Sequence, residues 1–364
     1  MKSIFFRSMA LIFVVAGALA AGLAWQALRF VRTAPSTDDT QIVFEVRRGQ
    51  TLRDIAVQLE KQNLITDQKK FRLYVRFKAL ENKVRAGEYA LKRNMSPGQI
   101  LKVLASGRSI EYAITISEGL NRFEIASLVE KQGIGTRDEF LKLTQDRDFI
   151  SRNLGVRVPT LEGYLFPETY YVTRAAGVRG LVVQMLTKFK ETFTAVPDVV
   201  ETASSVALTR AEIVVLASII EKETGAPFER PRISSVFHNR LKKGMRLQTD
   251  PTVIYGLWSK TGTWNRNISR QDLLTPSAYN TYTIRGLPPG PIANPGREAL
   301  LAAVQPETSE FLFFVSRNDG THVFSKDYQQ HRAAVGDFQL NRKAREGKSW
   351  RDLKNPPKAG VKKK

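Results

Sequence analysis

The chain has no cysteine and only three histidines among its 364 residues. Without cysteine it forms no disulfides, holds no zinc through thiolates and has no thiol nucleophile. The histidines (His238, His322 and His331) are not spaced as metal ligands such as H-x-x-x-H, and no G-x-S-x-G turn supports a serine hydrolase. The sequence therefore argues against a metalloenzyme and predicts no metal site.

Positive charge is the main excess in the composition. Lysine and arginine number 56 against 35 acidic residues, which gives a net charge of +21 and an isoelectric point near 10.1. This charge predicts attraction to polyanions or to an anionic membrane surface. Because the charge is diffuse and no helix-turn-helix or RNA-binding motif is present, we expect anionic lipid or wall polymer rather than nucleic acid.

A long apolar run lies near the N-terminus. Residues 8–28 carry no charge, have basic residues on both sides and match the length of a membrane-spanning helix. Residues 18–20 resemble a cleavage site, so a cleaved signal peptide is the alternative, but the apolar run continues beyond them. We expect a short inner tail (1–7), a transmembrane helix (8–28) and a linker (29–41). We therefore expect a single-pass protein of the cell inner (plasma) membrane with its bulk periplasmic or otherwise extracytoplasmic, although similar flanking charge leaves the positive-inside rule undecided.

A small α+β module is expected at residues 42–108. Ile42–Val46 alternates as a strand does, and Thr51 then caps a helix. The other expected elements are helices near 71–80 and 96–105 and an extended segment at 86–90. The pattern T-L-x-x-I-A-x-x-L in the first helix resembles the LysM type of glycan-binding module.

Residues 109–345 are expected to form a larger, mainly helical domain with a short β-sheet. Candidate helices at 117–132 and 137–145 precede the segment Leu161–Tyr170, which breaks the helical pattern. The aromatic rings of and beside that segment are Tyr164, Phe166, Tyr170 and Tyr171. Together with Glu162 and Glu168 they could form the floor of a sugar groove, or they could be ordinary core, and both interpretations stay open.

The most informative segment of this domain is the helix around Glu221. Thr209 and Glu212 make a capping box that predicts its start, and Gly225 is expected to end it. Apolar residues occupy most of its circumference, so we expect the helix to be buried. Two carboxylates, Glu221 and Glu223, point roughly 200° apart on it and cannot serve the same site.

Of these two carboxylates, Glu221 is the better candidate for chemistry. It continues a face of small side chains, including Ala217 and Ser218, that would leave room for an approaching group, whereas Glu223 continues a bulky stripe. Partial burial and the negative end of the helix dipole would both raise the pKa of Glu221, as a general acid requires. The alternative is an exposed glutamate paired with Lys222 or an arginine, and the helix pattern does not decide between the two.

Polar residues in special backbone positions follow this helix. Pro231 and Gly244 are expected to bound the next helix, and Asp250 to cap another one before Pro251. Asp250 could instead orient water or sugar near Glu221.

The last part of the chain contains more loops. Segments 277–282 and 285–292 are typical of ordered loops that carry binding groups. Asn294 is expected to cap a helix, and the pattern at residues 311–325 predicts a β-hairpin. The basic tail at 346–364 is expected to be disordered.

Several long motifs in fixed order resemble those of one family. They are Leu161–Tyr170, Ala217–Thr224, Ser235–Leu241, Met245–Gly256 (MRLQTDPTVIYG) and Gly286–Pro295 (GLPPGPIANP). In these motifs the chain is similar to the endolytic murein transglycosylase family. With the apolar N-terminus and the LysM-like module, the likeness extends from Met1 to about Arg345.

The resemblance implies internal cleavage of nascent peptidoglycan strands at the MurNAc–GlcNAc β-1,4 bond. Glu221 matches the family's catalytic glutamate, which protonates the leaving oxygen and then, as a base, helps the MurNAc C6 hydroxyl attack its own anomeric carbon. The 1,6-anhydro product makes the enzyme a lyase, needs no cofactor or metal, and would terminate glycan elongation. We expect Gln248, Asp250 and Asn280 to bind the substrate, and peptidoglycan synthases to be partners.

Two other functions remain open at this point. A hydrolytic muramidase would use Glu221 as acid and Asp250 as the second carboxylate. A non-catalytic scaffold would bind the wall through the LysM-like module and tether synthases.

Overall fold

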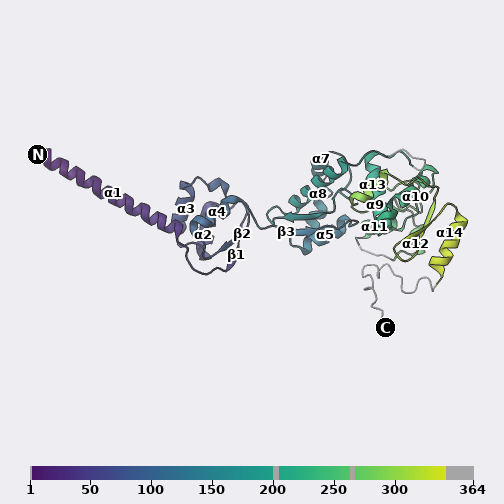
Figure 1. Ribbon diagram of the computed structural model, residues 1–364, viewed down its shortest axis with the longest axis horizontal. Helices are drawn as coiled ribbons and strands as arrows, with labels where there is room; N and C mark the ends of the chain where they lie inside the picture. The colour runs from purple at the N-terminus through teal and green to yellow at the C-terminus, as the bar shows by residue number, and fades with distance from the viewer. Residues whose placement is uncertain (1, 200–204, 263–266, 342–364) are drawn as a thin grey trace, which may run out of the picture. The chain divides into compact units, whose positions relative to one another are not determined.

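In the computed structural model the chain folds into two compact units, and Figure 1 labels most of their helices and some of their strands. The N-terminal unit comprises the chain up to Tyr112 together with Tyr171–Gly177, and the C-terminal unit comprises the rest. The residues described are 2–199, 205–262 and 267–341, with side chains described at residue 9 and from residue 11 onward. The tail predicted at 346–364 lies outside them.

The N-terminal unit begins with a long apolar helix, α1 (Lys2–Arg32). Its apolar segment is Leu11–Arg32, in which an 18-residue stretch has a mean hydropathy of 2.0 and no buried residue. By length and composition the helix is compatible with the predicted single-pass anchor. Its end packs on the rest of the unit, because Phe30 joins the apolar core.

Two strands and three helices surround that core. Strand β1 (Gln41–Val46) pairs antiparallel with β2 (Gly87–Lys92). The helices are α2 (Leu52–Lys61), α3 (Gln68–Phe77) and α4 (Pro97–Ser106), with a 3-10 turn, η1 (Glu81–Lys83). This order confirms the predicted strand, helix, helix, extended segment and helix, with ends shifted by a few residues. The predicted cap at Thr51 is also confirmed, as a capping box with Asp54.

The C-terminal unit is mostly helical. The helices of its first part are α5 (Arg122–Lys131), α6 (Arg137–Leu143), α7 (Arg147–Leu154) and α8 (Gly177–Thr194). Strand β3 (Tyr112–Thr115) pairs with β4 (Thr169–Val172) in a small sheet. The sequence predicts a helix from Ser117, but Asn121 and Glu124 form a capping box, so α5 begins only at Arg122.

Helix α9 (Arg210–Glu223) lies at the centre of the second part. Every residue from Ile213 to Ile220 is buried, and α9 contacts α10, α11 and α13. The elements that follow it are η2 (Pro227–Glu229), α10 (Arg230–Lys242), α11 (Asp250–Thr261), α12 (Arg270–Leu274), α13 (Arg297–Val304), β5 (Phe313–Ser316), β6 (His322–Ser325), α14 (Tyr328–Val335) and the π-helix η3 (Gly336–Leu340). The antiparallel pairing of β5 with β6 confirms the predicted hairpin.

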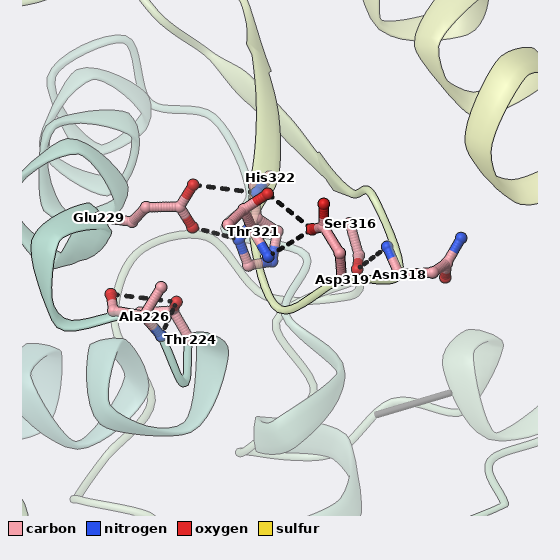
Figure 2. Close-up of polar contacts among 8 residues, drawn as sticks. All are labelled: Thr224, Ala226, Glu229, Ser316, Asn318, Asp319, Thr321 and His322. Carbon is pink, nitrogen blue, oxygen red and sulfur yellow. Dashed lines mark hydrogen bonds and ion pairs between the residues drawn. The ribbon is translucent and has the colours of Figure 1, made fainter. Parts of the chain in front are cut away.

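The two ends of α9 differ in how well the sequence predicts them. Thr209 and Glu212 form the expected capping box at the start. At the other end Thr224 is extended (φ −136°, ψ 139°), and Gly225 is not left-handed. The predicted glycine cap is therefore wrong. Thr224 instead accepts the amide hydrogen of Ala226 at 2.9 Å, a turn visible in Figure 2.

Candidate active site

Glu221 lies in the last turn of α9 with both carboxylate oxygens engaged. Its side chain is 5% exposed. One oxygen accepts a hydrogen bond from Arg230 Nη2 at 2.9 Å, and the other accepts the amide hydrogen of Gly296 at 3.0 Å. The alternative of an exposed glutamate is wrong, although its pairing with an arginine is right. Lys222 points elsewhere and donates to the carbonyl oxygen of Gly119 at 3.0 Å.

The neighbours of Glu221 affect its protonation in opposite directions. Burial raises the pKa of Glu221 above its ordinary value and is the largest influence. The charge of Arg230 and the hydrogen bond from Gly296 lower that pKa, whereas the charge of Glu118 raises it. The net direction is upward, which is the direction that a general acid needs.

Glu118 is the second carboxylate of this cluster. Its oxygen lies 3.6 Å from the same Arg230 Nη2 that binds Glu221. Unlike Glu221, it is about half exposed, with 48% of its side chain accessible. One guanidinium therefore stands between a buried and an accessible carboxylate. A side chain at Gly296 would overlap the Glu118 carboxyl group and displace it from its place beside Arg230.

The small side chains of α9 serve a purpose that the sequence did not predict. Ala217 and Ser218 are fully buried, and Ser218 Oγ accepts the amide hydrogen of Ile292 at 3.1 Å. This face was predicted to leave room for an approaching group. For the substrate that prediction is wrong, because Ala217 and Ser218 are fully buried. What approaches is the chain's own loop before α13, and this close approach brings the Gly296 amide to Glu221.

A buried carboxylate, Glu162, holds that loop in place. It is 1% exposed and accepts hydrogen bonds from the Arg122 amide at 3.1 Å, the Tyr255 hydroxyl at 3.0 Å and Asn294 Nδ2 at 3.0 Å. Asn294 also accepts from the Leu165 amide at 2.9 Å. Asn294 was expected to cap α13, which is wrong, since Gly296 occupies the capping position without a side-chain bond. Burial raises the pKa of Glu162 to about 7.

The aromatic segment Leu161–Tyr170 belongs to the interior. Tyr164, Phe166 and Tyr170 are buried, and Tyr164 packs edge-on against Phe189 with ring centroids 5.1 Å apart. This favours ordinary core over a sugar-binding floor. Tyr171, the ring just after the segment, is exposed.

Glu223 has polar surroundings of its own. The Thr249 hydroxyl donates to its carboxylate. Burial raises the pKa of Glu223 to about 7, the charge of Asp250 adds to the rise, and Arg240 opposes it. The prediction that Glu223 only continues a packing stripe is therefore incomplete. The second carboxylate near Glu221 is Glu118, whereas the charge of Asp250 affects the pKa of Glu223.

Replacing Glu223 with glutamine is expected to change how stability depends on pH. A carboxyl group whose pKa is raised to about 7 in the folded state stabilises the fold fully below its ordinary pKa, and this stabilisation is lost as pH rises through about 7. The wild-type free energy of unfolding should therefore fall between pH 5 and pH 8 by about 2–3 kcal/mol more than that of Glu223→Gln. Urea unfolding at both pH values measures this. Glu298→Gln, at an exposed position of the same unit, should keep the wild-type slope, and equal slopes in all three proteins would contradict the prediction.

Gln248, Asp250 and Asn280 occupy different environments. Gln248 is exposed and left-handed (φ +51°). Asp250 is exposed and accepts the Tyr282 hydroxyl at 2.6 Å. Its predicted capping role is wrong, because Thr249 occupies the capping position of α11 and makes no side-chain capping bond. Asn280 is 1% exposed, and its amide nitrogen donates to carbonyl oxygens at the end of α12, the shortest bond being 2.7 Å to Thr275. Gln248 and Asp250 are thus free to meet a ligand, and Asn280 holds its own loop.

The start of α10 joins this cluster to the hairpin. Glu229, the residue before Arg230, accepts the backbone amide of His322 at 3.0 Å and contacts its ring Nδ1 at 2.8 Å (Figure 2). Both side chains are about nine-tenths buried. Consecutive residues therefore bind two separate parts of the unit: Glu229 binds β6, and Arg230 binds Glu221.

The match of the sequence to known proteins covers the whole of this arrangement. Residues 44–337 match the YceG-like family. The chain belongs to that family. It is 31% identical over 314 residues to the endolytic murein transglycosylase of Bacillus subtilis, covering 81% of this chain and 84% of that protein. The family resemblance expected from the sequence motifs is thereby confirmed.

Two further relatives of this YceG-like chain extend the comparison. An endolytic murein transglycosylase of Streptococcus pneumoniae (serotype 2) is 29% identical over 325 residues, which span 80% of this chain and 57% of that protein. A crystal structure of a yceG-like protein from Listeria monocytogenes is 31% identical, with a TM-score of 0.51 over 80% of this chain and 98% of that one.

Four residues of this site escaped the sequence analysis. They are Glu118, Arg230, Gly296 and, in its true role, Asn294. Gly296 meets Glu221 across 75 positions of sequence, and no local pattern marks such a contact. One available indication was the run of small residues on α9, which points to close approach by some segment of the chain.

Proposed function

We propose that this protein is a membrane-anchored endolytic murein transglycosylase in which Glu221 is the acid and base. It would cut the MurNAc–GlcNAc β-1,4 bond within nascent peptidoglycan strands and leave 1,6-anhydro-MurNAc ends. The observation that carries the proposal is the buried Glu221 carboxyl with a raised pKa, in a chain related to murein transglycosylases.

The two hydrogen-bond donors that contact the Glu221 carboxyl group, Arg230 and the Gly296 amide, suit a group that acts first as an acid and then as a base. As an acid, Glu221 protonates the glycosidic oxygen as the bond breaks. The resulting carboxylate is stabilised by Arg230 and by the Gly296 amide, which already point at its two oxygens. As a base, the carboxylate then accepts the proton of the C6 hydroxyl as that oxygen attacks the anomeric carbon. Because this nucleophile belongs to the substrate itself, no second catalytic carboxylate is needed.

Glu118 completes this cycle in the proposal. When Glu221 carries its proton, the Arg230 charge needs another partner, and the Glu118 carboxylate lies 3.6 Å away. Arg230 would interact mainly with Glu118 while Glu221 is protonated and with Glu221 after it has ionised. A charge shared in this way avoids leaving a buried guanidinium unpaired in either state.

The wider organisation belongs to the same proposal. Helix α1 would anchor the protein in the plasma membrane with the bulk outside the cytoplasm. The N-terminal unit would act as the LysM-like glycan-binding module, and synthases would be neighbours at the growing strands. Gln248 and Asp250, both exposed, remain our candidates for contacts with the glycan.

Mass spectrometry of a peptidoglycan digest made by the full-length protein in detergent tests the reaction. New ends that lack one water relative to a hydrolysed end support the lytic mechanism. Hydrolysed ends would overturn it in favour of a muramidase. No new ends, with glycan still bound, would favour a wall-binding scaffold.

Opposite shifts in the pH profile are expected from changes at Glu118 and Arg230. The alkaline limb of activity follows the pKa of Glu221, because only the protonated acid can start the reaction. Glu118 raises that pKa and Arg230 lowers it. Glu118→Gln should therefore move the alkaline limb to lower pH, and Arg230→Gln should move it to higher pH.

The control for this pair is Arg232→Gln on the same helix. Arg232 pairs with Glu307 at 3.0 Å near the surface, so its replacement should leave the profile unchanged. Initial rates of release of anhydro products across pH measure all three variants. Shifts of Glu118→Gln and Arg230→Gln in the same direction would contradict the shared-charge arrangement.

A further inference from the structure

The end of α1 has features of a membrane–water boundary. The Arg29 guanidinium lies over the Trp25 ring, 5.5 Å from its centroid, and tryptophan and arginine are typical of that boundary. The apolar span Leu11–Arg32 has 22 residues, or about 33 Å at 1.5 Å per residue, against a hydrocarbon thickness of about 30 Å. If α1 spans the bilayer, its last turn lies at the lipid surface.

That last turn is packed against α3 and α4 rather than followed at once by a free linker. Phe30 joins the core of the N-terminal unit. The side chain and carbonyl oxygen of Val31 each lie 3.1 Å from the point where a Cβ on Gly98 would stand, and the Tyr74 hydroxyl lies 3.6 Å from it. The contacts of α1 with α3 and α4 therefore hold these two helices at the level of its end.

Helix α3 exposes apolar side chains on its outer face. Phe77 is 83% exposed, the highest value among the large apolar side chains that the structure describes, and Leu73 is 69% exposed. They are four residues apart, so they lie one above the other on the helix. Phe71 and Val75 already fill the core from the opposite side. Phe77 follows Tyr74 by three residues, so the two side chains are neighbours on the surface of α3. Because Tyr74 lies near α1, Phe77 is closer to the side of α3 that faces α1 than to the opposite side.

The same helix is basic. The segment from Asp67 to Glu81 contains five lysines or arginines and two acidic residues. Lys69 and Lys70 are exposed next to Leu73. A helix with exposed aromatic and leucine side chains among lysines is typical of one that lies in the interface of an anionic bilayer.

We infer that α3 lies on the lipid bilayer, with Leu73 and Phe77 inserted between headgroups and with Lys69 and Lys70 at anionic lipid phosphates. Contact through both α1 and α3 would fix the N-terminal unit against the membrane instead of leaving it to swing on one helix. This inference rests on the proposed membrane anchor and is independent of the chemistry at Glu221.

The absence of native cysteine allows a direct test with one fluorescent label in the full-length protein. Phe77→Cys, labelled with the environment-sensitive dye NBD, is reconstituted in vesicles of phosphatidylglycerol and phosphatidylethanolamine. Arg47→Cys is the matched control, because Arg47 is exposed. It follows the last residue of β1, and β1 separates it from the linker by about 20 Å. We expect the emission of the label at 77 to shift to the blue, its quenching by aqueous iodide to fall several-fold relative to that of the label at 47, and spin-labelled lipid to quench it.

Further variants and outcomes separate this inference from its alternatives. Lys69→Glu with Lys70→Glu should restore part of the iodide quenching at 77 in anionic vesicles and change little in neutral ones. A label at 77 that is as open to iodide as the label at 47 overturns the inference. Protection from iodide without quenching by spin-labelled lipid also overturns it, and indicates a second copy of the chain if the protection disappears at low protein-to-lipid ratio. Failure of the protein to float with the vesicles removes the anchor and this inference with it, while digestion of peptidoglycan by the same sample tests Glu221 separately.

Discussion

Replacing Glu221 with glutamine is expected to abolish the formation of 1,6-anhydro ends and leave the fold intact. Glutamine keeps the size of the side chain and can accept from Arg230 or from Gly296, but it cannot transfer a proton to a glycosidic oxygen. Loss of one general acid–base group lowers rates by roughly 10²- to 10⁴-fold. Because Glu221 would serve both steps, we expect the upper part of that range.

Glu223→Gln is the matched control for this experiment. The two glutamates are two positions apart on α9, yet Glu223 bonds to Thr249 and Glu221 to Arg230. Digestion of purified peptidoglycan by both variants, with circular dichroism as a check on folding, compares them. Activity retained in Glu221→Gln and lost in Glu223→Gln would reverse the assignment.

Glu162→Gln is expected to have the largest effect on stability. The carboxylate accepts hydrogen bonds on both oxygens from the Arg122 amide, Tyr255 and Asn294. A glutamine would turn an NH2 group toward at least one of these donors and leave it unpaired in the interior. At pH 8, above the pKa of about 7 at which Glu162 ionises, the expected loss is about 2–3 kcal/mol, or on the order of 5–10 °C in the melting temperature.

The control for this change lies in the same segment. Glu168 is half exposed and contacts Lys188 at 3.8 Å, so Glu168→Gln should change the melting temperature little. Differential scanning calorimetry measures both variants. A Glu162→Gln protein as stable as wild type would mean that the loop before α13 is held by other contacts.

Local signals in the sequence predicted local structure well. The cap at Thr51, the capping box at Thr209 and the hairpin at residues 311–325 depend on groups a few residues apart, and a sequence displays such spacing directly. Amphipathic patterns likewise gave the order of elements in the N-terminal unit. The burial of α9 also followed from its apolar circumference, whereas that pattern left the burial of Glu221 itself undecided.

Long-range contacts were beyond the same reasoning. Asn294 stands before a helix and looks like a cap, but tertiary bonds to Glu162 and to the Leu165 amide take its side chain. Asp250 before Pro251 suggests a cap in the same way, yet its carboxylate meets Tyr282, which is 32 positions away. A polar side chain near the start of a helix has several possible hydrogen-bond partners. The partner that it binds depends on segments that come together only in the folded chain.

The adjacency of Glu229 and Arg230 has a mechanical consequence. If the β5–β6 hairpin moves and keeps its hydrogen bonds from His322 to Glu229, Glu229 moves with it. Arg230 then moves as well, because it follows Glu229 directly in the chain and begins α10. The guanidinium that faces Glu221 would move with it. The hairpin and the acid are therefore linked through two adjacent residues: a ligand that displaced the Asn318–Gly320 turn and with it the Arg230 guanidinium would change the pKa of Glu221 without contacting that side chain.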